Sequence, residues 1–337
     1  MNHFKNAFVG AIMFSAASLA HAWNGVGHIA ITELALDAAS DDMPAWINNA
    51  LFHERVAFMC NEPDRRRGAG LTNLDHENNP EHYFDIDQLE RDFDLSFEAL
   101  PPLRYDFVLA MGKAMHNEPE RFVRQASDKA GIGWMPGFLP YAMHEDYVKL
   151  VSAFRMCRIL EEFAQDDPLR ANELMQARAE AAHHMGILAH WTADAAQPLH
   201  TTIHHHGWIG DNPEGYTTER GIHAYIDGGV LRAHDLNADT LVGALEIEPI
   251  EVADTANPWD EILAHIERSF EQVEPLYRME RDDQLKTDKG RAFILDRLSD
   301  GAGTLAGLYQ AAWEQSEIDD QDIATYLKYE APSPNQP

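Results

Sequence analysis

The chain has 337 residues, and 45% of them are hydrophobic, which is enough for a large core without disulfides. Its 26 basic and 56 acidic residues give a formal charge of -30. This charge argues against a broad basic surface that tracks duplex phosphates, but it does not exclude local phosphate binding by metal ions. Only Cys60 and Cys157 are present, so the chain is not a disulfide scaffold, and a single bridge between them stays open.

The first 22 residues have the pattern of a secretory signal peptide. Lys5 precedes an apolar run over residues 7–20, and the run leads into the small-x-small triplet that ends at Ala22. We expect cleavage after Ala22, which leaves a mature chain that begins at Trp23 and is secreted or periplasmic. No other stretch reaches the roughly 18 apolar residues of a membrane-spanning helix, so we expect no transmembrane segment.

Helical periodicity dominates the rest of the sequence. Apolar residues recur at three- and four-residue steps over residues 29–39, 105–114, 147–163, 171–196, 258–273 and 290–314. Segments rich in Pro, Gly, Asp and Asn at 61–73, 75–82 and 207–221 predict long loops. We therefore expect an all-α fold, with a single multi-helix domain over residues 23–328 and a disordered tail at 329–337.

Two histidine-aspartate pairs indicate metal chemistry. His190 and Asp194 are four residues apart in a helical pattern, so their side chains project from one face of the helix. Pro198 then ends the helix, and His200 follows it. His223 and Asp227 repeat the same four-residue spacing. Imidazole nitrogens and carboxylate oxygens are ordinary zinc ligands, so the pattern predicts a zinc site without thiolates.

Further candidate ligands lie upstream. His82 stands beside several acidic residues, and either Asp64 or Asp75 is placed to accompany it. Cleavage after Ala22 exposes Trp-Asn-Gly-Val-Gly-His, in which His28 follows a free α-amine that can itself chelate a metal ion.

From Trp23 to Asp227 the chain resembles the superfamily that joins bacterial zinc-dependent phospholipases C with single-strand nucleases of the S-one/P-one type. In that superfamily an N-terminal tryptophan is itself a zinc ligand. The resemblance implies a phospholipase C/P-one nuclease-like fold and three zinc ions. One ion would be held by Asp64, His82, His190 and Asp194, a second by His200, His223 and Asp227, and a third by Trp23 and His28, with Asp194 bridging the first and third.

The resemblance also implies roles for residues around the cluster. Asp64 is preferred over Asp75 because Arg67 then completes an Asp-x-x-Arg pattern of the nuclease branch. Asp64, Asp194 and Arg67 are the predicted catalytic residues, and Tyr83 and Asp85 are candidate substrate-binding residues. The stretch from His82 to His190 is longer than in the family, so we expect extra helices or loops there.

Three functions remain open from the sequence. The HYFD and GIHAYID segments, and the absence of a Gly-Gly-Asn motif after His200, favour a phospholipase C that contacts a membrane surface transiently. The spacings from Trp23 to His28, Asp64 to Arg67 and His200 to His223 resemble the nuclease branch, whose substrate is single-stranded nucleic acid. The third possibility is a secreted protein that binds zinc without catalysis. In each case we expect a monomer.

Overall fold

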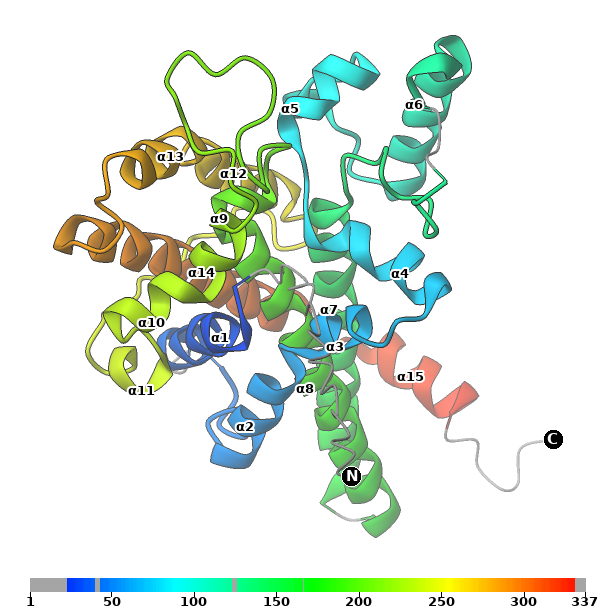
Figure 1. Ribbon diagram of the computed structural model, residues 1–337. Coiled ribbons are helices and arrows are strands. Elements are labelled where there is room, and N and C mark those ends of the chain that lie inside the picture. Colours follow the sequence, from blue (N-terminus) through cyan, green and yellow to red (C-terminus); the bar gives the residue numbers. More distant parts are fainter. Residues whose placement is uncertain (1–22, 40–42, 123–125, 166, 331–337) are drawn as a thin grey trace, which may run out of the picture.

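The computed structural model describes residues 23–39, 43–122, 126–165 and 167–330, and the regular structure in these ranges is almost entirely helical (Figure 1). The helices are α1 (Gly25–Ala39), α2 (Ala50–Met59), α3 (Glu62–Arg67), α4 (Thr72–Asn78), α5 (Ile86–Gln88), α6 (Arg104–Asn117), α7 (Leu139–Ala164), α8 (Pro168–Ala196), α9 (Ile222–Ala224), α10 (Val230–His234), α11 (Ala238–Leu241), α12 (Trp259–Phe270), α13 (Val273–Arg281), α14 (Asp288–Gln315) and α15 (Asp320–Tyr329). Short 3-10 turns occur at η2 (Asn79–His82), η4 (Phe97–Ala99), η5 (Pro119–Phe122) and η6 (Pro198–His200), and π turns at η3 (Leu89–Phe93) and η7 (Tyr225–Gly229). The predicted all-α class is confirmed.

All six predicted helices are present, but the segment 258–273 was predicted wrongly as one helix. It contains α12 and ends at the first residue of α13, because the chain turns at Glu271 and Gln272. The segment 207–221 is a loop, as predicted. Between His82 and His190 the chain forms α5, α6, α7 and most of α8.

Two of the predicted loops are helical instead. The segment 61–73 contains α3, and 75–82 contains most of α4 and all of η2. In α3, Pro63 lies in the first turn with Glu62 and Asp64, while three arginines occupy the last turn. Proline at a helix start needs no hydrogen-bond donor, and this order of charges complements the helix dipole, so local composition is compatible with a short helix.

The expected signal peptide lies outside the described residues. Tyr329, which we had placed in the C-terminal tail, is the last residue of α15, and residues 331–337 lie outside the described residues.

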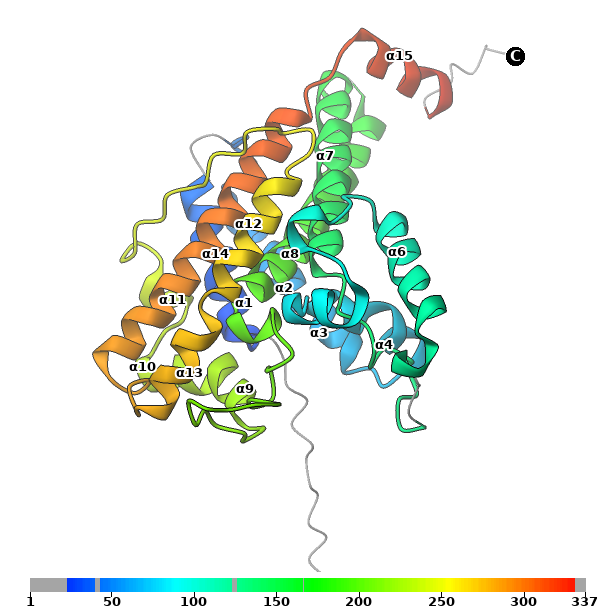
Figure 2. The same cartoon turned by 90° about the horizontal axis from the view of Figure 1, so that it is seen from above.

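Helices α7 and α8 form the central pair of the molecule. Figures 1 and 2 show α4 and α6 on one side of this pair, and α10, α13 and α14 on the other. Helix α1 packs against α14 and α8, and α2 packs against α8. The main hydrophobic core extends from Trp23 to Tyr326 in sequence, and a smaller one, which includes Leu199, Ile222 and Tyr277, lies next to the loop 207–221.

The C-terminal half of α8 is buried on every side. Residues 185–196 are all buried, and small side chains among them, such as Gly186 and Ala193, let neighbouring helices approach closely. His190 and Asp194 belong to this segment and have no exposed surface. Burying such polar groups is unfavourable unless they are paired or bind a metal ion, so these two residues mark a site.

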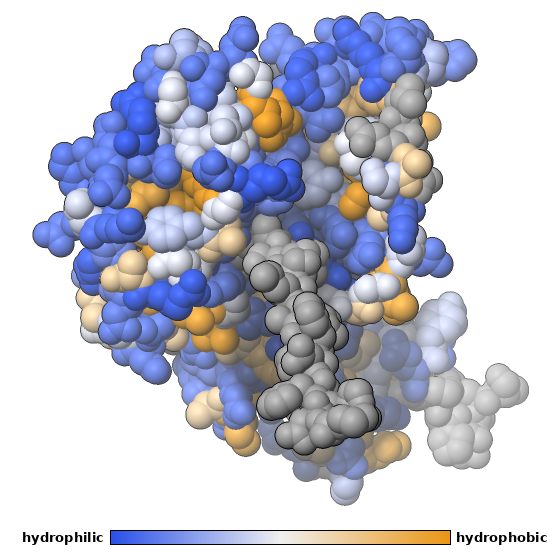
Figure 3. Space-filling model, in the orientation of Figure 1, coloured by the Kyte–Doolittle hydropathy of each residue, from blue (hydrophilic) through white to orange (hydrophobic). Residues whose placement is uncertain are grey.

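The surface reflects the acidic composition. The face in Figure 3 is mostly hydrophilic, and its hydrophobic side chains form small separate patches. Among the described residues, no helix has the length and apolar character needed to span a membrane. Cys60 and Cys157 are buried free thiols, so no bridge joins them.

Candidate metal centre

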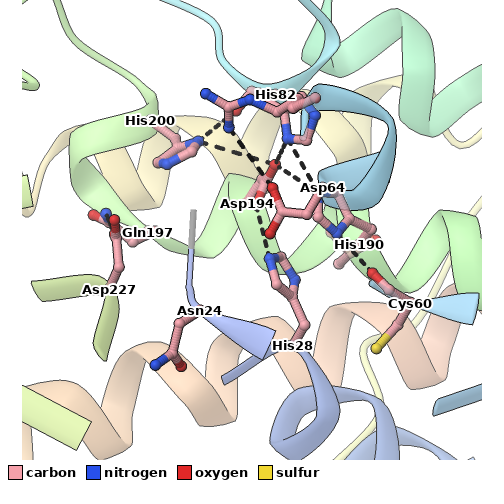
Figure 4. A network of polar contacts seen from close by, with 12 residues as sticks. Asn24, His28, Cys60, Asp64, His82, His190, Asp194, Gln197, His200 and Asp227 are labelled. Atoms are coloured by element: carbon pink, nitrogen blue, oxygen red, sulfur yellow. Dashed lines mark hydrogen bonds and ion pairs between the residues drawn. The ribbon is translucent and has the colours of Figure 1, made fainter. Parts of the chain in front are cut away.

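Eight of the predicted ligand side chains gather around the C-terminal end of α8, where Figure 4 shows most of them. They form three groups in which one ligand atom per residue lies within 4.8 Å of the others. The groups are Asp64 with His82 and His190, His28 with His190 and Asp194, and His200 with His223 and Asp227. Asp64 comes from α3, His82 from η2, His223 from α9 and Asp227 from η7.

Asp194 lies between the first two groups. Its Oδ2 is 3.0 Å from His82 Nδ1 and 3.4 Å from His190 Nε2. Its Oδ1 faces the other way and is 3.5 Å from His28 Nε2. The two oxygens of one carboxylate therefore face different imidazoles, which is the arrangement that a bridging ligand requires.

Helix geometry and a proline position the next ligand. The four-residue spacing places His190 and Asp194 on one face of α8, and α8 ends at Ala196. Pro198 then starts η6, which turns the chain so that His200 Nδ1 lies 4.0 Å from Asp194 Oδ2. The third group therefore adjoins the first two.

The third group unites η6 with α9 and η7. His200 Nε2 and His223 Nε2 are 3.0 Å apart, and His223 Nε2 is 3.6 Å from Asp227 Oδ2. Two imidazole nitrogens at this separation share either a proton or a cation. Asn24 N donates to the backbone oxygen of Asp227, which ties the N-terminal segment to this group.

Trp23, the predicted ligand through its main-chain groups, is completely buried and lies two residues before α1. A Cβ added at Gly27 would come within 2.7 Å of Trp23 Cβ, so glycine permits this close turn. His28 follows one residue later, and its ring stacks on His190 with centroids 4.0 Å apart.

Hydrogen bonds on the outer side of the site fix the orientation of the ligands. His190 Nδ1 donates to Cys60 O at 2.7 Å, and His200 Nδ1 donates to His82 O, so both Nε2 atoms face inward. Gln197 Nε2 donates to Asp227 Oδ1 at 2.8 Å. Sequence reasoning missed Cys60 and Gln197, because a backbone acceptor has no sequence signature and Gln197 resembles an ordinary residue at a helix end.

His82 is supported by a side-chain amide. Asn78 Nδ2 lies 3.0 Å from His82 Nε2 and also donates to Pro63 O at 3.1 Å. A cation at His82 Nδ1 requires a proton on Nε2 and hence an acceptor there. Rotating the Asn78 amide by half a turn would supply its Oδ1, which is buried and has no hydrogen-bond partner among the described residues, at the cost of the hydrogen bond to Pro63 O.

The electrostatics fit a bound cation. Burial lowers the pKa of His82 and His223 well below the ordinary histidine value and that of His200 to about 3, so these imidazoles are neutral and can act as ligands. Burial also raises the pKa of Asp194 to about 6 and that of Asp227 well above its usual range.

Three buried carboxylate oxygens have unused bonding capacity. Within the described part of the chain, Asp64 Oδ1, Asp194 Oδ1 and Asp227 Oδ2 have no hydrogen-bond partner. Buried carboxylates of this kind require a compensating positive charge. A divalent ion in each group would supply it, and nitrogen and oxygen donors suit zinc.

The other predicted residues occupy different positions. Arg67 Nη1 is 3.8 Å from Asp64 Oδ1, and its side chain is 23% exposed. Asp75 lies in α4 and belongs to none of the three groups. Tyr83 is half-buried, and its hydroxyl donates to Met135 O at 3.5 Å. Asp85 is buried, and burial raises its pKa well above the usual range.

Comparisons with known proteins do not classify the chain. No model of a protein family matches it, and a search of curated proteins finds no significant match.

Proposed function

We propose that this chain is a secreted zinc-dependent phosphodiester hydrolase with a phospholipase C/P-one nuclease-like fold, which acts after cleavage following Ala22. The main support is the position of Asp194, whose two oxygens face imidazoles of two groups while the third group lies beside it. Three ions would be held by these groups, with the main-chain atoms of Trp23 completing the site of His28. When bound, zinc ions acidify a coordinated water and neutralise negative charge on a phosphoryl oxygen.

The protein's own residues bind and orient the substrate. The Arg67 side chain is 23% exposed and its Nη1 lies 3.8 Å from Asp64 Oδ1, and a guanidinium can donate two parallel hydrogen bonds to a phosphate. The ligand imidazoles are at most 6% exposed, so water is excluded from behind them and the electrostatic attraction for a phosphate is strengthened. Tyr83 and Asp85 follow His82 in sequence and are the proposed contacts to the rest of the substrate.

For the substrate we favour a glycerophospholipid, which a phospholipase C cleaves to diacylglycerol and a phosphorylated head group. This preference rests on the segments HYFD and GIHAYID, which resemble the phospholipase branch. The alternative is single-stranded nucleic acid, favoured by the placement of Arg67 beside Asp64. Both substrates contain a phosphodiester, so the same cluster serves either reaction.

The deciding experiment measures turnover of the processed protein, beginning at Trp23, on phosphatidylcholine vesicles and on single-stranded DNA. Each assay is run as purified, after a zinc chelator, and after zinc is restored. We expect release of phosphocholine that the chelator abolishes and zinc restores. Nucleotide release with intact lipid would replace the phospholipase by the nuclease. Zinc retained without hydrolysis of either substrate would leave a zinc-binding protein and contradict the enzymatic function.

A further inference from the structure

His223 is supported differently from the other imidazoles of the candidate metal centre. His190 and His200 each direct their outer nitrogen, Nδ1, to a backbone oxygen. The outer nitrogen of His223 instead lies 3.2 Å from Nδ1 of another histidine, His206. His206 is half-buried and belongs to a run of three histidines, His204, His205 and His206.

The chemistry of two imidazoles determines the direction of this hydrogen bond. Because Nε2 of His223 faces His200 and Asp227, a cation held there leaves the proton of His223 on Nδ1. His206 Nδ1 must then accept that proton. Metal-binding histidines usually donate their outer N–H to a carboxylate, a carbonyl or water, and here an imidazole takes that place.

The loop that carries His206 is held in position from both sides. The ring of His204 stacks on Trp208 with centroids 3.8 Å apart, and the hydroxyl of Tyr277 donates to His204 O. His205 Nδ1 lies 3.1 Å from Thr202 O, so its imidazole bonds within its own loop. Only a fixed loop can present an acceptor to His223 without losing conformational entropy when the ion binds.

We propose that His206 is a positioning residue that accepts the Nδ1 proton of His223 and thereby orients His223 Nε2 toward the ion shared with His200 and Asp227. This inference rests on the proposed zinc centre. It assigns this role to His206 alone within the histidine run. His204 stacks on Trp208, and His205 contacts the rings of His206 and His223 only edge-on while its Nδ1 bonds to Thr202 O.

The test compares two substitutions of nearly equal shape. His206→Asn keeps an acceptor oxygen close to the position of the ring Nδ1, whereas His206→Leu removes it. His205→Leu serves as the matched control, because it removes an imidazole that packs edge-on against the rings of His206 and His223 but bonds through Nδ1 to Thr202 O. Zinc affinity is measured for the processed protein by equilibrium dialysis against buffered free zinc, and Co²⁺ absorption spectra report the ligand geometry.

We expect His206→Leu to weaken binding of one ion about 10- to 100-fold, the usual effect of losing the outer partner of a metal-binding histidine. His206→Asn and His205→Leu should bind zinc like the unchanged protein. Circular dichroism establishes that each variant is folded. If His206→Leu does not fold, His206→Gln takes its place, because the glutamine oxygen lies near the position of ring Nε2 and leaves His223 Nδ1 without an acceptor.

The measured zinc affinities distinguish the role of His206 from the proposed function. If the protein without substitutions binds zinc and the His206→Leu variant binds it with equal affinity, the role of His206 is overturned and the proposed function remains intact. Equal losses in His206→Asn and His206→Leu would also overturn it. If the protein without substitutions binds no zinc, both the proposed function and the role of His206 are overturned.

Discussion

Asp194 contacts three of the imidazoles in the candidate metal centre. It is completely buried, faces His28 with one oxygen, and faces His82 and His190 with the other. An asparagine has almost the same shape but no charge, and its amide nitrogen cannot bind a cation. Replacing this residue therefore tests the bridging geometry without creating a cavity.

Asp194→Asn should abolish turnover, with a loss larger than the roughly 100-fold upper range for losing an outer partner of a metal ligand. Far-UV circular dichroism should show that most of the helical content remains. Asp75→Asn is the control, because Asp75 belongs to none of the three groups. An active Asp194→Asn protein would rule out the proposed cluster.

At the scale of elements, the contact between α2 and α8 positions His190. A Cβ added at Gly186 of α8 would come within 2.5 Å of Met59 Cβ and 2.8 Å of Val56 O. Glycine therefore allows the end of α2 to lie directly against α8. The same approach places Cys60 O where it accepts the Nδ1 proton of His190. The packing of α2 on α8 therefore also determines the orientation of the His190 ring.

Gly186→Ala should lower the free energy of unfolding by about 1–3 kcal/mol, the usual cost of overpacking a core. The control is Gly112→Ala in the exposed part of α6, where an added Cβ meets nothing within 4 Å. That change should stabilise the protein by up to about 1 kcal/mol, because alanine is the better helix former. Urea unfolding of the metal-free proteins measures both, and a neutral Gly186→Ala would contradict the close contact.

At the scale of the whole molecule, the candidate centre joins elements that are far apart in the sequence. Asp64 and His82 come from α3 and η2, and His223 and Asp227 come from α9 and η7. Ions bound between them would cross-link these segments and offset the burial of Asp194 and Asp227. Stability and function should therefore depend on the same ions.

Removing zinc should destabilise the folded protein. Free zinc at 100 times its dissociation constant contributes about 2.7 kcal/mol for each site. For a protein of this size, that energy corresponds to a fall in Tm of roughly 4 °C for each site. Differential scanning calorimetry with and without a chelator measures the change, and restoring zinc should reverse it. An unchanged Tm would show that the buried carboxylates are not compensated by metal ions.

Local geometry explains why the sequence alone predicted much of this protein. An α-helix repeats every 3.6 residues, so apolar steps indicate the long helices, and a spacing of four places His190 beside Asp194 and His223 beside Asp227. The short helices α3 and α4 escaped prediction because segments of this length are not stable by themselves and form only when packed against others.

Only the tertiary structure decided which of these residues meet. His82 and His190 are 108 residues apart in sequence, yet their nitrogens lie 3.1 Å from each other. It also placed Asp64 rather than Asp75 with them, and turned His206 toward His223. Contacts of this kind depend on how helices pack across α8, and residue spacing along the chain carries no information about such packing.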